Sequence, residues 1–447
     1  SWNPKEVVDI AAKQLGIPVL PKLLKGVRGL TGKERDMEFI AKGLLREKYG
    51  LYVNKDGTTR YDAIDVPITH FKPKEINVSV SALKKYGYEK DVYGKVLEKD
   101  DQILELKVQD IIISDNSDFS GVDYFVNICK FVDELLEKVY CLEPFYRVKS
   151  GKDLVGQLVI GLAPHTSAGI VGRIIGFTPA KICYAHPFWH SAKRRNCDGD
   201  EDSILLLMDA LLNFSRKYLP TTRGASTMDA PLVLTVHLDP EEVDDEAWSV
   251  DVVDSYPLSF YEDTLEFKKP WEIREKIELV EDRIGKPSVY HSKFMYDTSD
   301  INDGVFKSKY VVLETMIEKL EAQLALATMA VAVDESDVSE KILEKHLLKD
   351  IKGNMRTFSR QKLRCVACNG KYRRVPLTGK CSCGGKLLLT VSEGTVRKYI
   401  EPANHIMDNF KITSYLRQQF EIIESEVDAF FGKKAKQFKL AMFEKKK

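Results

Sequence analysis

Short extended segments separated by turn-forming residues are the feature that most limits how this chain can fold. Between residues 51 and 114, apolar runs such as 76–80, 103–108 and 111–113 alternate with Gly, Pro and Asp. Similar runs occur at 158–160 and 231–237. Runs this short favour a barrel over a doubly wound sheet. We therefore expect an α+β fold in which these segments form a β-barrel.

Helical periodicity marks other parts of the chain. Apolar residues recur at three- and four-residue spacing in 6–15, 33–48 and 122–139. Residues 204–214 are apolar nearly all round, which predicts a helix buried on most sides. Amphipathic helices are expected at 271–283 and 310–331.

Charge and hydropathy exclude several classes of protein. Lys plus Arg equals Asp plus Glu at 67 each, so any affinity for nucleic acid must come from local patches. With 447 residues, 44% of them hydrophobic, the chain can bury two or three cores. No run approaches the length of a membrane span and no hydrophobic signal region is present. We expect a cytoplasmic protein without a membrane partner.

The stretch Asn196-Cys-Asp-Gly-Asp-Glu-Asp202 carries the strongest chemical signal. Alternate carboxylates on an extended loop project to one side and can bind hard divalent cations. Gly199 leaves room for a metal ion or phosphate near the backbone. The preceding cations Lys193, Arg194 and Arg195 suit a polyanionic substrate. The pattern indicates phosphoryl or nucleotidyl transfer.

Two other interpretations of this stretch were weighed. An EF-hand loop needs Gly at its sixth position and Glu at its twelfth, where this chain has Ser203 and Asp209, so that loop is excluded. Residues 201–203 can instead cap a following helix, which suits them better than metal binding. Asp198 and Asp200 lie upstream of that cap and remain the metal-ligand candidates.

Four cysteines near the C-terminus predict a structural zinc site. Cys365 and Cys368 are separated by two residues, and Cys381 and Cys383 by one, where two are usual. Residues 351–400 also contain twelve basic residues against one acidic residue. Such an excess in a neutral chain is typical of a phosphate-binding surface, to which Arg373 and Arg374 would belong.

The segment 186–202, which reads HPFWHSAKRRNCDGDED, resembles the catalytic motif of the large subunit of the archaeal D-family DNA polymerases. Four further segments resemble the same subunit, namely 65–73, 161–176, 211–216 and 228–233. The resemblance implies a double-psi β-barrel of the two-barrel polymerase type. It also implies nucleotidyl transfer with two Mg²⁺ ions, in which Asp198 and Asp200 bind metal and Asn196 supports them. The implied partners are primer–template DNA, deoxynucleoside triphosphates and a small proofreading exonuclease subunit.

Several residues have both a functional and a structural interpretation. His165, His186 and His190 lie near the acidic stretch and, with Arg173, could contact DNA or nucleotide or serve as hydrogen-bonded structural residues. Gln437, Leu440 and Phe443 resemble a peptide that binds a sliding clamp. A short helical tail would look the same.

The expected organisation follows from these signals. A helical segment (1–50) precedes the catalytic barrel (51–240, with a helical insertion near 118–157). A mixed α/β accessory region (241–345), a basic zinc ribbon (346–395) and a helical C-terminal region (396–447) follow. Because the chain begins without Met, we interpret it as a C-terminal fragment or one part of a split large subunit. A non-catalytic DNA-binding scaffold and an RNA-synthesising relative remain alternative functions.

Overall fold

The chain forms two compact units in the computed structural model, which describes residues 3–22, 24–25, 38–164, 166, 168–215, 232–293, 300–304 and 307–432. Unit 1 comprises Ser1–Tyr256 and Glu275–Phe306, and unit 2 comprises Pro257–Arg274 and Lys307–Lys447. The predicted accessory region at 241–345 is thus divided between the units. No helix within the described ranges is long and apolar enough to cross a membrane.

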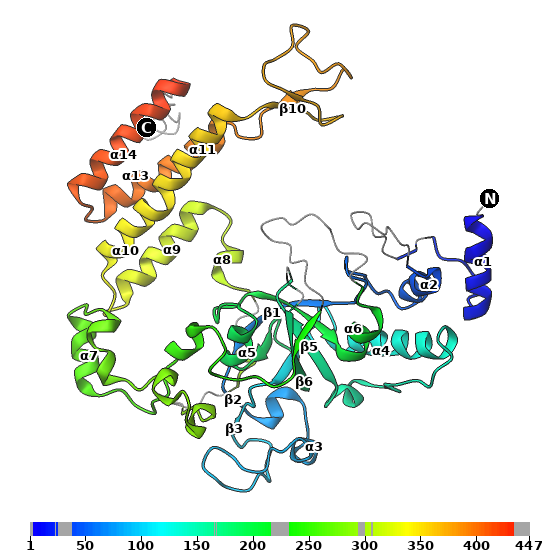
Figure 1. Ribbon diagram of the computed structural model, residues 1–447. Helices are drawn as coiled ribbons and strands as arrows, with labels where there is room; N and C mark the ends of the chain where they lie inside the picture. The colour runs from blue at the N-terminus through cyan, green and yellow to red at the C-terminus, as the bar shows by residue number, and fades with distance from the viewer. Residues whose placement is uncertain are drawn as a thin grey trace, which may run out of the picture. The chain divides into compact units, whose positions relative to one another are not determined.

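Unit 1 is built on a closed six-stranded β-barrel (Figure 1). The barrel strands are β1 (Tyr61–Pro67), β4 (Asp110–Ser114), β5 (Leu158–Leu162), β6 (Ala168–Thr178), β7 (Cys183–Ala185) and β8 (Glu201–Leu206). They follow the order β4-β7-β1-β8-β5-β6, and β4 also pairs with β6, which closes the ring. A further strand, β9 (Val233–Thr235), pairs with β6. The expected barrel and its mixed α/β setting are confirmed.

The predicted helix at 204–214 is wrong in its first three residues. Residues up to Leu206 belong to β8, and only α6 (Leu207–Asn213) is helical. β8 pairs with β1 on one side and β5 on the other. Its residues from Asp202 onward are buried, with Ile204 and Leu206 in one core and Leu205 in another. An apolar run buried on both faces has no strand periodicity and therefore resembles a buried helix. The predicted helix cap at 201–203 is wrong for the same reason.

Two other predicted elements are also wrong. The expected strand at 76–80 is replaced by a 3₁₀ turn, η1 (Pro73–Ile76), and by α3 (Val80–Lys85). The Ser79 hydroxyl accepts a hydrogen bond from the Ala82 N–H and so caps α3. The expected helix at 271–283 is a series of 3₁₀ turns, η5 (Pro270–Glu272), η6 (Arg274–Lys276) and η7 (Val280–Arg283).

Helices cover the barrel and complete its core. α1 (Pro4–Leu15) and α2 (Ile40–Lys48) precede the barrel, and α4 (Gly121–Lys138) lies between β4 and β5. The buried face of α4 includes Phe125, Phe131 and Leu135, which share one core with β4 and β8. A two-stranded antiparallel sheet of β2 (His70–Phe71) and β3 (Leu104–Glu105) packs in a neighbouring core.

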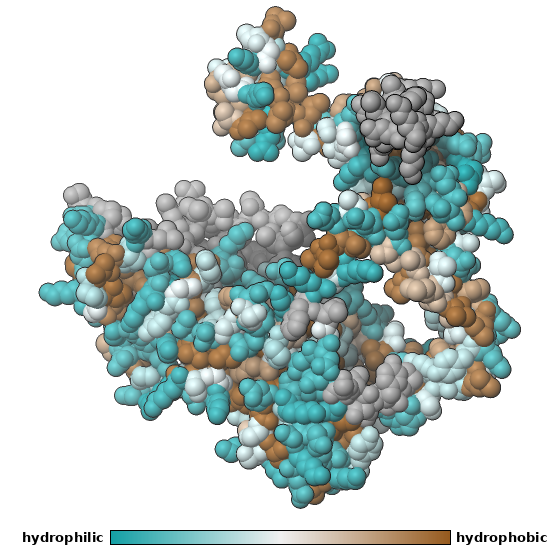
Figure 2. Space-filling view, turned by 180° about the vertical axis from the view of Figure 1, so that it is seen from behind, coloured by the Kyte–Doolittle hydropathy of each residue, from teal (hydrophilic) through white to brown (hydrophobic). Residues whose placement is uncertain are grey.

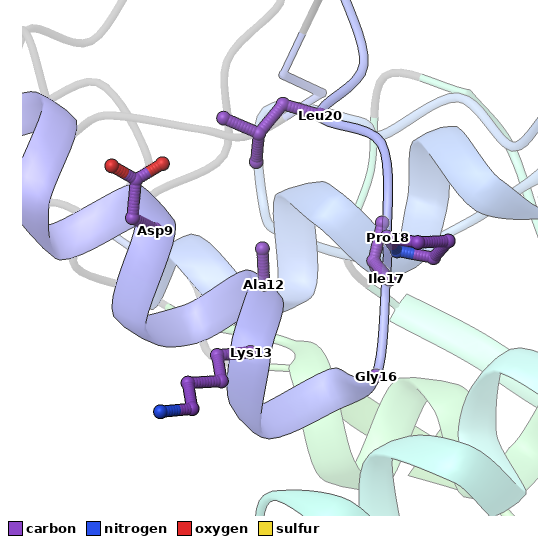
Figure 3. Close-up of a pocket in the computed structure, with 7 residues that line it drawn as sticks. All are labelled: Asp9, Ala12, Lys13, Gly16, Ile17, Pro18 and Leu20. Carbon is purple, nitrogen blue, oxygen red and sulfur yellow. The ribbon is translucent and has the colours of Figure 1, made fainter.

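A shallow pocket lies between α1 and the segment that follows it, shown in Figure 3. Its volume is about 510 Å³, and among the described residues that line it Asp9 and Lys13 are the charged ones. One carboxylate and one amine on the same helix do not form a recognisable binding site.

Unit 2 consists of helices and a small three-stranded sheet. The helices are α7 (Leu258–Leu265), α8 (Lys309–Val312), α9 (Met316–Met329), α10 (Glu335–Lys341), α11 (Leu348–Arg360), α12 (Glu393–Arg397), α13 (Ile400–Asn409) and α14 (Ser414–Phe431). A π-helical segment, Ile342–Leu347, joins α10 to α11. The unit has its own core, which includes Leu347, Ile406 and Phe420. The sheet contains β10 (Leu363–Cys365), β11 (Lys371–Tyr372) and β12 (Leu387–Leu388).

Candidate active site and cysteine cluster

The acidic stretch is a loop that joins α5 (Pro187–Ala192) to β8. We call residues 193–200 the acidic loop. Asp198 is exposed and Asp200 is half-buried. Gly199 has a φ of +100°, a conformation that side chains rarely adopt, which explains glycine between the two aspartates. The loop therefore presents two carboxylates to solvent from a rigid barrel edge.

Backbone contacts fix the second half of the acidic loop. The Asp65 N–H at the end of β1 donates to the Asp200 carbonyl at 3.2 Å. The Asn196 N–H donates to Asp200 Oδ2 at 3.4 Å. Asn196 thus supports Asp200 through its backbone. The Cys197 N–H donates to Glu246 Oε1 at 3.2 Å, so an acidic residue beyond the barrel also contacts the loop.

Lys193 is the first residue of the loop, and its side chain is fully buried. Its Nζ is 2.8 Å from Asp65 Oδ2 and also donates to Asp202 Oδ2. Burial lowers the pKa of Lys193 to about 8, while the Asp65 carboxylate opposes this shift. The ammonium therefore remains charged at neutral pH. It is paired with the Asp65 and Asp202 carboxylates within the protein.

The two arginines next to Lys193 differ in exposure. Arg194 is exposed, and its Nη1 lies 3.4 Å from Asp244 Oδ2. Arg195 is largely buried; its Nη2 donates to the Glu201 carbonyl at 2.7 Å and its Nε lies 3.5 Å from Asp200 Oδ2. Of the three loop cations, Arg194 is the one that solvent reaches freely.

Two of the three histidines predicted near the loop, His186 and His190, are buried. His186 caps α5, because its Nδ1 accepts the Phe188 N–H at 3.1 Å. Burial lowers the pKa of His186 to about 3, so the ring is neutral. His190 is fully buried, with Nδ1 3.3 Å from Asp65 Oδ1. His165 lies outside the described residues.

Arg173, predicted near the site, pairs with a buried carboxylate instead. Its Nε and Nη2 donate to Asp110 at 2.9 and 2.8 Å, and its guanidinium lies over the Tyr86 ring. Burial is the largest single influence on its pKa and would lower it, but the hydrogen bonds to Asp110 and the negative charge of Asp110 together raise the pKa. Arg173 thus joins β4 to β6.

The four cysteines of unit 2 form a cluster. Their Sγ atoms all lie within 4.8 Å of one another. Cys365 Sγ is 3.5 Å from Cys383 Sγ, and Cys368 Sγ is 3.4 Å from Cys381 Sγ. The short second pair therefore does not keep Cys383 away from the other thiols. Four converging thiols are the donor set of a tetrahedral structural zinc site.

Local geometry supports this donor set. A Cβ on Gly385 would lie 2.6 Å from Cys365 Sγ, so a side chain there would occupy the space between the thiols. A hydrogen bond from the Tyr372 hydroxyl lowers the pKa of the Cys381 thiol to about 5. The deprotonated thiolate is the form that binds metal.

The surface around the cluster is basic and partly apolar. Arg373 and Arg374 are exposed in the segment between the two cysteine pairs. Val366, Val375 and Leu377 are exposed beside them. In Figure 2 the part of the chain that holds the cysteine cluster, at the top of the view, shows hydrophilic and hydrophobic residues side by side.

Comparison with known proteins decides the family. The family model for the DNA polymerase II large subunit DP2, catalytic domain, matches residues 19–319. The chain is 50% identical over 443 residues to the DNA polymerase II large subunit of Methanothermobacter thermautotrophicus, covering 99% of this chain and 40% of that protein. It is 53% identical over 431 residues to that of Pyrococcus furiosus, covering 96% of this chain and 34% of that protein. The chain belongs to the DP2 family.

This DP2 family member spans 34–40% of the length of these two relatives. The matched catalytic domain contains the whole barrel and the acidic loop. The first alignment covers 443 of 447 residues, so it includes the cysteine cluster as well. The resemblance inferred from the segment 186–202 is confirmed at the level of family.

The DP2 barrel contains one buried acidic pair that the sequence interpretation missed. Asp65 was not singled out, and Asp202 was assigned to a helix cap. Both are fully buried and lie beside Lys193. A signal was present, since Asp65 interrupts the apolar strand residues Ile64 and Val66, where a charged residue needs a partner.

Some predicted residues of this DP2 chain cannot be placed. The predicted clamp-binding residues lie beyond the described range, which ends at 432; they are Gln437, Leu440 and Phe443. Within the described residues, groups of three or more metal-binding side chains occur twice, at the four cysteines and at Asp65, His190 and Asp202. Asp198 and Asp200 belong to neither group.

Proposed function

We propose that this chain is the catalytic part of a DNA-directed DNA polymerase, which adds deoxynucleotides to a primer 3′ hydroxyl during replication. The observation that carries the proposal is the acidic loop. Two carboxylates flank a glycine at the edge of a closed barrel, in a chain about 50% identical to DNA polymerase II large subunits. The barrel would be of the double-psi type.

The donor set at Asp198 and Asp200 fits Mg²⁺. Magnesium binds through one or two carboxylates and completes its shell with waters and substrate phosphates. The exposed Asp198 and the half-buried Asp200 offer such ligands without a closed cage. Two bound Mg²⁺ ions would supply charge neutralisation at the transferred phosphate and activation of the 3′ hydroxyl.

The residues of the chain itself provide positioning. Asn196 and Asp65 fix Asp200 through backbone hydrogen bonds. Arg195 lies against the same carboxylate and lowers its repulsion with neighbouring acids. Arg194 is exposed and is the loop cation best placed to meet an incoming triphosphate.

Unit 2 would bind DNA. The four cysteines would hold one structural Zn²⁺ as a zinc ribbon, and the basic surface with Arg373 and Arg374 would contact the phosphates of duplex DNA. A small proofreading subunit, the remainder of the large subunit and a sliding clamp would be further partners. The name "large subunit" carried by the relatives favours an assembly of unequal subunits.

Primer extension tests this proposal. The chain, assembled with its partner subunits, is compared with the Asp198→Asn/Asp200→Asn variant in the presence of Mg²⁺. We expect extension to fall by more than about 100-fold. Glu242→Gln, an exposed acid of the segment that contacts the loop, is the matched control and should extend normally. Unchanged extension in the double variant would favour a non-catalytic scaffold.

A further inference from the structure

Beneath the acidic loop lies a second group of ligand atoms that resembles a metal site. Asp65, His190 and Asp202 come from β1, α5 and β8, and their ligand atoms all lie within 4.8 Å of one another. All three side chains are fully buried. Two carboxylates and one imidazole are a common donor set for divalent transition metals.

An ammonium group of the chain itself occupies this group. Lys193 Nζ is 2.8 Å from Asp65 Oδ2 and bonded to Asp202 Oδ2. It also lies over the Trp189 ring, 5.2 Å from its centroid. Several polar atoms of the group are buried without a hydrogen-bond partner of good geometry, namely Asp65 Oδ1, Asp202 Oδ1 and both ring nitrogens of His190. The group therefore has ligand atoms that make no hydrogen bond, while the Lys193 ammonium occupies the position that a metal ion would take.

The cluster connects directly to both ends of the acidic loop. Lys193 is the first loop residue, and Asp202 follows Asp200 by two positions. The backbone of Asp65 holds the Asp200 carbonyl. Arg195 extends the same network, because its Nε lies 3.8 Å from Asp202 Oδ1 and 3.5 Å from Asp200 Oδ2. Movement of the buried cluster would thus be transmitted to Asp200.

We propose that Lys193 is a positioning residue that acts in place of a metal ion. Its ammonium fills the Asp65–His190–Asp202 group, ties the two ends of the acidic loop together and leaves Asp198 and Asp200 as the ligands for divalent cations. The part of this inference that concerns Asp198 and Asp200 rests on the proposed function. The part that concerns the buried ligand group does not.

The first test removes the ammonium and asks whether a metal takes its position. In Lys193→Gly, the freed carboxylates and imidazole should bind Co²⁺ with the weak visible absorption of oxygen and nitrogen ligands. Thiolate ligation at the cysteine cluster gives stronger charge-transfer bands and is therefore distinguished. We expect this added Co²⁺ signal to disappear in Lys193→Gly/His190→Gln and to be absent from the parent chain. Lys193→Gly without such a signal would overturn the proposal.

The second test measures Mn²⁺ binding at Asp198 and Asp200 by electron paramagnetic resonance. Loss of a residue that orients metal ligands weakens metal binding by roughly 10–100-fold, which we expect for Lys193→Met. Lys181→Met, which breaks an exposed ion pair with Asp118, is the matched control and should leave Mn²⁺ affinity unchanged. Unchanged affinity in Lys193→Met would contradict the positioning role.

A charge-balanced variant keeps the test decisive if Lys193→Gly does not fold. Lys193→Met/Asp202→Asn removes one charge of each sign, so it should bind Mn²⁺ more tightly than Lys193→Met alone. A double variant no better than the single one would overturn the proposal. Failure of the proposed function would give a different result. Asp198→Asn/Asp200→Asn would then extend primers normally, and this outcome does not depend on the Co²⁺ experiment.

Discussion

Replacing Lys193 by methionine should destabilise unit 1 strongly, because it leaves two buried carboxylates without their shared cation. Asp65 and Asp202 are fully buried, and their ligand oxygens lie within 4.8 Å. At an effective dielectric constant of about 20, two like charges at that distance repel by about 3.5 kcal/mol. Breaking a buried ion pair by removing one partner typically costs about 3–5 kcal/mol. We expect a loss of about 3–5 kcal/mol at pH 7.

Urea denaturation followed by near-ultraviolet circular dichroism measures this loss. Lys181→Met is the same substitution at an ion pair whose lysine is about one-third exposed. Surface ion pairs contribute at most about 1 kcal/mol, so this control should remain close to the parent chain. Lys193→Met/Asp202→Asn should recover part of the lost stability. Equal, small effects of Lys193→Met and Lys181→Met would refute the electrostatic reasoning.

Three further predictions concern zinc, packing and pH. Cys383→Ser should lower the zinc content per chain measured by mass spectrometry, whereas Cys141→Ser, at an exposed free cysteine, should not; equal zinc contents would contradict the four-thiolate site. Gly161→Ala should lower the free energy of unfolding by about 1–3 kcal/mol, because its Cβ would lie 2.4 Å from the Trp189 ring. Gly353→Ala, in open space on α11, should raise the free energy of unfolding by about 1 kcal/mol. Chemical denaturation measures both changes. Effects of the same sign would count against this packing argument. Burial lowers the pKa of His186 from 6.5 to about 3. Below pH 6.5 the unfolded chain therefore binds a proton that the folded chain does not. The free energy of unfolding then falls as the pH drops toward 3. His186→Asn, which retains a helix cap, should lose less stability over that range, and superimposable pH profiles would show the reasoning to be wrong.

Features set by local spacing could be predicted from the sequence. The cysteine pairs at 365–368 and 381–383 form one cluster, although the second pair is shorter than usual. The acidic loop lies between elements of the barrel and exposes Asp198, since alternate carboxylates around a glycine require an open turn. The barrel itself follows from short apolar runs, of which 111–113 and 158–160 are strands.

Features set by long-range pairing could not be predicted in this way. Ile204 and Leu206 pack in one core and Leu205 in another, so both faces of this strand are buried. Burial on both faces removes the periodicity that separates a strand from a helix. The pairing of Lys193 with Asp65 and Asp202 was not predicted. Asp65 lies 128 residues away in the chain and reaches Lys193 only through closure of the barrel.

The central claim is that Asp198 and Asp200 bind the divalent cations of nucleotidyl transfer. Anomalous X-ray scattering from crystals of the assembled polymerase with primer–template, Mn²⁺ and a non-reactive nucleotide tests it directly. We predict an anomalous peak between the two carboxylates that is lost in Asp198→Asn/Asp200→Asn. A map without density at that position, with substrate bound, would contradict the account.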